Sequence, residues 1–204
     1  MRFILVRHTE TVGNAEHRFN GLTESPYTEK GLKMNDVLTD ELAALHAKHP
    51  IDRIYASPIT RAKHIGELAA EKLNVPLTIA DQLIEFNFGI FDGLTHAEAM
   101  AKDGELWSRW MSDYNHVRLT DGDQYDVFHN ALGDWLQTFD LASDQTVVMI
   151  SHGGTLHSLL LNLLDLPMGV KWHFHLDLGG IMIVDTPEGY GILKAMYSPN
   201  YEDC

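Results

Sequence analysis

The alternation of short apolar runs with segments of helical periodicity constrains the fold more than any other feature. Residues 2–6 (RFILV) and 146–150 (TVVMI) read as fully buried strands, which are typical of parallel sheets covered on both faces. Leucines recur at roughly helical spacing over residues 29–48. Strands alternating with helices imply βαβ units, so we expect an α/β fold: a three-layer α/β/α sandwich with a mostly parallel central sheet and helices on both faces.

The remaining elements continue this order. Ser57 and Pro58 have the residue types of an N-cap and a first helical position, so a helix is expected from there to Asn74. No repeat or linker interrupts the sequence, and we expect one domain over residues 1–204. Residues 88–122 are long enough for a lid over a site or, equally, for a packing helix. Further strands are expected at 53–56, 77–84, 180–185 and 191–197, and further helices at 95–114, 123–139 and from Gly153 to about Leu164.

The composition, with 45% hydrophobic and 22% charged residues, is that of an ordinary soluble globular protein. The formal net charge of −14 argues against nucleic acid as a partner, because phosphate backbones select basic surfaces. A small phosphorylated ligand stays open, since arginines in direct contact outweigh distant, screened carboxylates. No apolar stretch is long enough to cross a bilayer, no signal segment is visible, and Cys204 is the one cysteine. We expect a cytoplasmic protein with no membrane partner.

Cationic and imidazole side chains follow three of the expected strands. Arg7 and His8 end the first, Arg61 lies one turn into the helix after the second, and His152 follows the apolar strand near residue 150. In open α/β sheets, ligands bind beyond the carboxyl ends of the strands. Arginine suits phosphate oxygens, and a glycine such as Gly153 lets the backbone approach a ligand. Each residue alone could be a cap or a core histidine, but their joint placement favours an anion site.

Glu85 lies between the apolar residues Ile84 and Phe86. Burial would disfavour the charged form of its carboxyl group, which makes it a candidate proton donor near neutral pH. On a strand, however, apolar neighbours that face the core turn the residue between them outward. On the residues alone, an outward-facing Glu85 is the simpler interpretation.

Four segments occur in the order and spacing of a known family. They are Arg7–Asn14, Ser57–Ala62, Glu85–Gly93 and Ser151–Gly154. Together they resemble the four signatures of the histidine phosphatase superfamily, which includes the cofactor-dependent phosphoglycerate mutases, and the resemblance covers almost the whole chain. It implies the same three-layer α/β sandwich. Two departures are Thr9, where the family has a glycine, and Gly122-Asp123-Gln124, where it has Gly-Glu-Ser.

The resemblance implies a role for each matching residue. His8 would be the nucleophile that becomes phosphorylated, and Glu85 would protonate the leaving oxygen. The threonine at position 9 could alter the turn after the nucleophile, because a β-branched residue has less backbone freedom than glycine. The residues implied to hold the phosphoryl oxygens are Arg7, Arg61 and His152, with Asn14 in the phosphate pocket and Asn20-Gly21 in the loop that closes on the substrate.

The expected function is hydrolysis of a small phosphorylated metabolite through a phosphohistidine intermediate. The first alternative is a phosphoglycerate mutase-type transfer, but those mutases have a basic segment after the glutamate motif that binds a second phosphate. Residues 94–118 contain only Lys102, Arg109 and Arg118 as basic residues, which favours hydrolysis. The second alternative is a non-catalytic phospho-ligand binding protein, and the complete set of chemical residues argues against it.

No metal or cofactor is expected, although the chain contains 12 histidines. His173 and His175 have strand-like spacing with only Asp177 nearby, and His152 and His157 are spaced so that a helix would point their rings apart.

The substrate stays open at this stage. Trp107, Trp110 and Tyr114 share one helical face, which could stack on a leaving group but more commonly packs a core. The last strands could pair across a homodimer.

Overall fold

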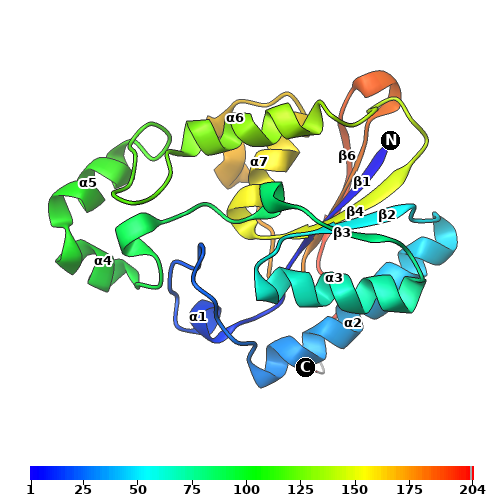
Figure 1. The fold of residues 1–204 in the computed structure, drawn as a ribbon, viewed down its shortest axis with the longest axis horizontal. Coiled ribbons are helices and arrows are strands. Elements are labelled where there is room, and N and C mark those ends of the chain that lie inside the picture. Colours follow the sequence, from blue (N-terminus) through cyan, green and yellow to red (C-terminus); the bar gives the residue numbers. More distant parts are fainter. Residues whose placement is uncertain (203) are drawn as a thin grey trace.

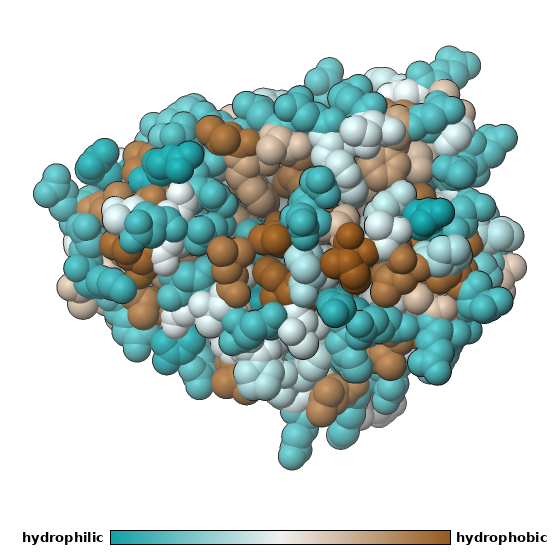
Figure 2. Space-filling view, viewed as in Figure 1, coloured by the Kyte–Doolittle hydropathy of each residue, from teal (hydrophilic) through white to brown (hydrophobic). Residues whose placement is uncertain are grey.

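The structure, a computed structural model, describes residues 1–202 and residue 204. Figure 1 shows a central sheet with helices on both faces and, at one end, two short helices that extend away from it. The expected α/β sandwich is confirmed. On the face shown in Figure 2, hydrophobic residues gather near the middle and hydrophilic residues cover most of the rest. No helix in the described residues is long and apolar enough to cross a membrane.

Six strands form one sheet in the order β3-β2-β4-β1-β5-β6. The first four pair in parallel, whereas β5 pairs antiparallel with both β1 and β6. β6 is therefore an edge strand. A homodimer formed by pairing of the last strands would require this position. The strands are β1 (Arg2–Arg7), β2 (Arg53–Ala56), β3 (Leu77–Ile79), β4 (Thr146–Ser151), β5 (Ile181–Asp185) and β6 (Ile192–Tyr197).

Two helices cover each face of the sheet. α2 and α3 pack on one face, and α6 and α7 pack on the other. α4 and α5 lie outside these layers, in a separate aromatic cluster (Figure 1). The helices are α1 (Val12–Ala15), α2 (Glu29–Lys48), α3 (Thr60–Leu73), α4 (His96–Lys102), α5 (Gly104–Ser112), α6 (Tyr125–Leu136) and α7 (Gly153–Leu163), with short 3₁₀ turns at Asp81–Leu83, Gly89–Phe91, Met168–His173 and Pro187–Gly189.

The alternation of side chains along β1 explains why both faces are covered. Phe3 and Leu5 pack with α6 and α7, whereas Ile4 and Val6 pack with α2 and α3. All four residues are at most 1% exposed. Because successive side chains of a strand point to opposite faces, an apolar run of this kind requires an apolar layer on each side. β1 accordingly lies inside the sheet, and its carboxyl end opens into the functional site.

Several expected helix and strand boundaries are wrong. The strand expected at 77–84 ends at Ile79, because Asp81–Leu83 form a tight turn. The helix expected at 95–114 is broken at Asp103, whose carboxylate accepts a hydrogen bond from Leu106 N–H (2.9 Å) and so starts α5. The helix expected at 123–139 is only Tyr125–Leu136. Asp123 stays outside it because its backbone and side chain bond to Asn87.

The helix expected to begin at Ser57 and Pro58 begins instead at Thr60, with Ile59 in the capping position. The Ser57 hydroxyl lies 2.9 Å from Nε2 of His152. It also accepts a hydrogen bond from Ile59 N–H (3.3 Å). The serine that resembles an N-cap therefore belongs to the functional site.

Candidate active site

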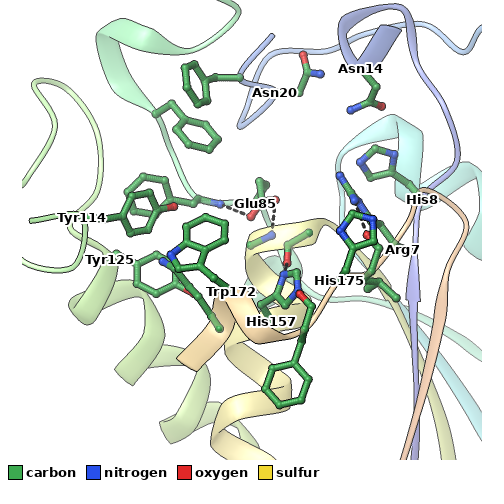
Figure 3. Close-up of a pocket in the computed structure, with 18 of the residues that line it drawn as sticks. Arg7, His8, Asn14, Asn20, Glu85, Tyr114, Tyr125, His157, Trp172 and His175 are labelled. Atoms are coloured by element: carbon green, nitrogen blue, oxygen red, sulfur yellow. Dashed lines mark hydrogen bonds between the residues drawn. The ribbon is translucent and has the colours of Figure 1, made fainter. Parts of the chain in front are cut away.

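A cavity of about 420 Å³ lies beyond the carboxyl ends of β1 and β4. Figure 3 shows Arg7 and His8 on one side of it, Tyr114 and Trp172 on the opposite side, and Glu85 between them. One end of the cavity therefore carries cationic and imidazole groups, and the other end is aromatic. The volume exceeds that of a phosphate, so the cavity has room for the group to which a phosphate is attached.

His8 follows β1 directly and is 3% exposed. Its Nδ1 lies 2.8 Å from the backbone oxygen of Thr9. Since a carbonyl can only accept, Nδ1 carries the proton and Nε2 keeps a lone pair. Burial, and then the positive charges of Arg61 and Arg7, hold the pKa of His8 well below its ordinary value. The ring is thus neutral, and its Nε2 carries an unprotonated lone pair.

Arg61, from the first turn of α3, is completely buried beside His8. Its Nε donates to Nε2 of His8 at 3.3 Å. The Nη groups donate to the backbone oxygens of Thr23 (2.9 Å), Asn20 (2.8 Å) and Gly21 (2.7 Å). These bonds fix the guanidinium in place, so its positive charge is held beside the His8 ring.

His152 lies at the end of β4 and is 1% exposed. Its ring centroid is 5.2 Å from that of His8, and its Nε2 bonds to Ser57. Nδ1 is buried and has no hydrogen-bond partner among the described residues. Burial, Arg61 and the neighbouring His8 lower the pKa of His152 well below its ordinary value. If His152 holds a phosphoryl oxygen, the lowered pKa therefore favours a neutral hydrogen-bond donor over a cation.

Arg7 lines the cavity next to His8. Its Nη1 donates to the Leu176 backbone oxygen at 2.6 Å, which orients the guanidinium. Nε is buried without a partner in the part of the chain that the structure describes. A Cβ at Gly153 would lie 3.4 Å from this guanidinium, so the glycine leaves the arginine room. Arg7 thus presents an unpaired donor close to the nucleophile.

Glu85 does not face outward, as its sequence pattern alone suggested; it is 8% exposed and lines the cavity. Oε1 accepts hydrogen bonds from Phe86 N–H (2.8 Å) and from the Thr155 N–H (3.0 Å) and hydroxyl (3.2 Å). Within the described residues, Oε2 accepts from Gly154 N–H alone (2.9 Å). Oε2 is therefore the oxygen with capacity for a proton. A Cβ at Gly154 would lie 2.6 Å from Oε1, so a glycine is needed there.

The two asparagines predicted to bind the substrate both line the cavity (Figure 3). Oδ1 of Asn14 accepts bonds from the Thr11 backbone (3.1 Å) and hydroxyl (2.8 Å). Nδ2 of Asn20 is buried with no partner within the described residues. Gly21, by contrast, does not line the cavity. Its carbonyl supports Arg61, and a Cβ there would lie 2.5 Å from the Phe86 backbone oxygen.

Thr9, which replaces the family glycine, is fully buried. Its hydroxyl lies within hydrogen-bond distance of the Asn35 side-chain oxygen (2.6 Å) and of the Gly31 backbone oxygen (3.1 Å). These bonds tie the turn after β1 to α2. The threonine therefore anchors the backbone whose carbonyl orients His8.

Several cavity residues were not predicted from the sequence. Most come from α7 and the chain after it or from the aromatic cluster, and Arg18 comes from the chain after α1. Lys171 gave no signal, and His157 and His175 were considered only as metal ligands. The unpredicted residues of the wall include Arg18, Phe88, Tyr125, His157, Lys171, Trp172, Phe174 and His175. Of the three aromatic residues expected on one helical face, Trp110 and Tyr114 line the cavity and Trp107 does not.

The histidines weighed as metal ligands bond elsewhere. Nε2 of His175 lies 2.9 Å from Oδ1 of Asp177. The ring nitrogens of His157 lie 2.7 Å and 2.9 Å from the backbone oxygens of Gly153 and Phe174. Among residues 1–202 and 204, no group of three or more His, Cys, Asp or Glu side chains is arranged to hold a metal ion.

The fold and this cluster agree with the sequence resemblance. Residues 3–198 match the sequence profile of the histidine phosphatase superfamily (branch 1), and the chain belongs to this family. The adenosylcobalamin/alpha-ribazole phosphatase of Salmonella typhimurium LT2 is 33% identical over 199 residues, which cover 97% of this chain and 96% of the relative. Phosphoserine phosphatase 1 of Hydrogenobacter thermophilus is 27% identical over 194 residues, covering 95% of this chain and 90% of the relative.

Among solved structures, the alpha-ribazole phosphatase from Shigella flexneri superposes with a TM-score of 0.88 at 27% identity, covering 97% of this chain and 96% of that one. The family and these phosphatase relatives make the chain a phosphoric monoester hydrolase or a phosphoglycerate mutase-like enzyme.

Proposed function

We propose that the protein is a phosphatase that hydrolyses a small phosphorylated metabolite through a phosphohistidine on His8, with Glu85 as the proton donor. The observation that carries the proposal is the state of the His8 ring: a neutral imidazole whose Nε2 keeps its lone pair beside fixed cationic groups. Three buried donors near it also lack partners in the described chain, namely Arg7 Nε, Asn20 Nδ2 and His152 Nδ1. Such donors suit phosphoryl oxygens.

In the first step, Nε2 of His8 attacks phosphorus and the bond between phosphorus and the ester oxygen breaks. Oε2 of Glu85 gives its proton to the departing oxygen, which leaves as an alcohol. Arg7, Arg61 and His152 face the charge that spreads over the equatorial oxygens. Because Nδ1 of His8 donates to Thr9, the positive charge that forms on the ring is stabilised by a backbone dipole.

In the second step, water attacks the phosphohistidine and the N–P bond breaks. Glu85, now ionised, takes a proton from the water, so inorganic phosphate is released and both residues return to their first state. No metal enters this scheme, and we expect activity to survive EDTA.

The substrate panel follows from the relatives. α-Ribazole 5′-phosphate and O-phosphoserine belong in it because relatives at 33% and 27% identity carry those names. The aromatic end of the cavity supports a leaving group with apolar surface, since Trp110, Tyr114 and Tyr125 form part of the wall. Sugar phosphates, nucleotides and phosphoglycerates complete the panel, run without added metal.

One experiment tests the intermediate. Protein mixed with a ³²P-labelled aryl phosphate and quenched in alkali should carry label that acid removes and base does not, and His8→Ala protein should carry none. Release of inorganic phosphate from the same compound separates a phosphatase from a mutase, which requires a bisphosphorylated primer and interconverts phosphoglycerates. A parent protein that binds phosphate but never becomes labelled would be a binding protein instead.

A further inference from the structure

Lys171 brings an ammonium group into the aromatic end of the cavity. It lies in the turn after α7, is 4% exposed and belongs to the cavity wall. Its Nζ is 3.4 Å from the ring centroids of both Tyr114 and Tyr125, and 4.9 Å from that of Trp172. Nζ has neither a hydrogen bond nor an ion pair within residues 1–202 and 204. Three aromatic rings therefore lie within 4.9 Å of the ammonium group, measured to their centroids.

A packing role alone does not account for this position. Lysines that cover apolar surface normally bury the stem and keep the ammonium in water. Here the ammonium itself is buried, and burial lowers its pKa to about 7. Cation–π contacts offset only part of the cost of removing a charge from water. A buried cation without an anion is therefore expected to have a partner that arrives with the ligand.

The charged and titratable side chains described around Nζ do not supply this anionic partner. Glu85 attracts it through space but makes no direct ion pair with it. The Tyr125 hydroxyl is engaged by the Ser158 hydroxyl at 2.9 Å, and burial raises the pKa of Tyr125 to about 12. Burial raises the pKa of Tyr114 well above its ordinary value, so this ring is neutral too. His129 lies near enough for Lys171 to lower its pKa.

We propose that Lys171 recognises a second anionic group, a carboxylate or a second phosphate, on the part of the substrate that leaves as the alcohol. The inference rests on the proposed function, because it assigns the far end of the same cavity. Arg7 and Arg61 would hold the group that is transferred, and Lys171 would select what is attached to it. The tyrosine rings hold the ammonium in position until the anion binds.

The test uses pairs of substrates that differ only in the second anion. 3-Phosphoglycerate and glycerol 3-phosphate differ by a carboxylate against a CH₂OH group, and fructose 1,6-bisphosphate and fructose 6-phosphate differ by a phosphate. The readout is the ratio of kcat/KM within each pair for the parent, Lys171→Met and the control Lys102→Met, whose lysine is exposed on α4. The two pairs separate a carboxylate from a phosphate as the preferred anion.

We expect the parent to prefer the member that carries two anionic groups in at least one pair. Lys171→Met should lower that ratio by about 10- to 100-fold, the range of a lost charged hydrogen bond, and Lys102→Met should not change it. The parent ratio should also fall as the pH rises through about 7, where free Lys171 loses its proton. For the phosphoglycerate pair the ratio in Lys171→Met should stay flat, because ionisation of the transferred phosphate cancels within the pair and the carboxylate stays ionised around pH 7.

A ratio that is the same in the parent and in Lys171→Met would overturn the inference. So would a parent preference for α-ribazole 5′-phosphate over every compound with a second anionic group, although the proposed phosphatase function would then stand. Dissociation constants for the same pairs, measured by calorimetry in His8→Ala protein, test the ammonium independently of turnover. If the parent hydrolyses nothing in the panel, the function fails, while the ratio of those constants still decides the role of Lys171.

Discussion

Replacing Glu85 with glutamine removes the proton that the proposed mechanism transfers and keeps the shape of the side chain. Oε1 has three donors around it, whereas Oε2 has only Gly154 N–H. A glutamine should place its oxygen where Oε1 accepts three hydrogen bonds and its NH₂ group where Oε2 faces Gly154 N–H. In the opposite orientation the NH₂ group would face three donors instead of one. One buried backbone N–H then lacks an acceptor.

The effects of Glu85→Gln on stability and on turnover can be estimated separately. An unpaired buried donor costs about 1–3 kcal/mol. Because the proposed mechanism has Glu85 protonated in the free protein, no negative charge is lost, and we expect the free energy of unfolding, measured in urea, to fall by about 1–3 kcal/mol. General acid catalysis typically contributes about 10²–10⁴-fold, so kcat for an alkyl phosphate should fall by that factor. Binding of inorganic phosphate should change little.

The leaving group provides the decisive comparison. p-Nitrophenolate leaves without protonation, so Glu85→Gln should reduce hydrolysis of p-nitrophenyl phosphate far less than that of an alkyl phosphate. Glu105→Gln, an exposed position in the first turn of α5, serves as the matched control and should leave both rates unchanged. If Glu85→Gln lowers the aryl and alkyl rates by the same factor, Glu85 is not the proton donor.

Further predictions concern the nucleophile, the packing and the pH. His8→Ala should lose covalent labelling, and hydrolysis at the parent rate would refute the assignment. Gly31→Ala should lower stability by about 1–3 kcal/mol in urea, because its Cβ would lie 1.9 Å from a backbone oxygen, whereas Gly104→Ala, with nothing within 4 Å, should not. The buried rings of His8 and His152, whose pKa values lie well below the ordinary value, protonate more readily once unfolded. The free energy of unfolding should therefore fall as the pH drops below about 6.5, by up to about 1.4 kcal/mol per pH unit for each ring, and His152→Gln should reduce that slope. Phosphatase activity should survive dialysis against EDTA.

The fold could be predicted because its determinants are local. Phe3 to Val6 form an uninterrupted apolar run, and such a run has one interpretation in a chain that alternates strands with helices. The boundaries that failed depended on contacts distant in sequence. Asp123 was assigned to a helix because nothing nearby reveals its bonds to Asn87. Asp103 could have been recognised, since an aspartate before a glycine and an apolar run is a usual N-cap.

The phosphoryl end of the site was predictable for a different reason. Arg7, His8 and His152 stand directly at strand ends, so the sheet order alone brings them together. Glu85 was ambiguous because period-two reasoning presumes a strand, and the chain at that point is not one. Lys171 gave no local signal at all, since its burial depends on Tyr114 and other rings more than forty residues away.

Arg61 shows how a single charge can serve the proposed reaction twice. Before phosphate binds, backbone oxygens of residues 20, 21 and 23 already hold its guanidinium beside His8. These carbonyl groups are dipoles rather than anions, so they orient the guanidinium without neutralising it. The charge then lowers the pKa of His8 and keeps Nε2 unprotonated. When the dianionic phosphoryl group arrives, the same charge meets its oxygens without reorganisation, which is the condition for electrostatic stabilisation of a transition state. A carboxylate in place of these carbonyls would hold the arginine equally well but would cancel both effects.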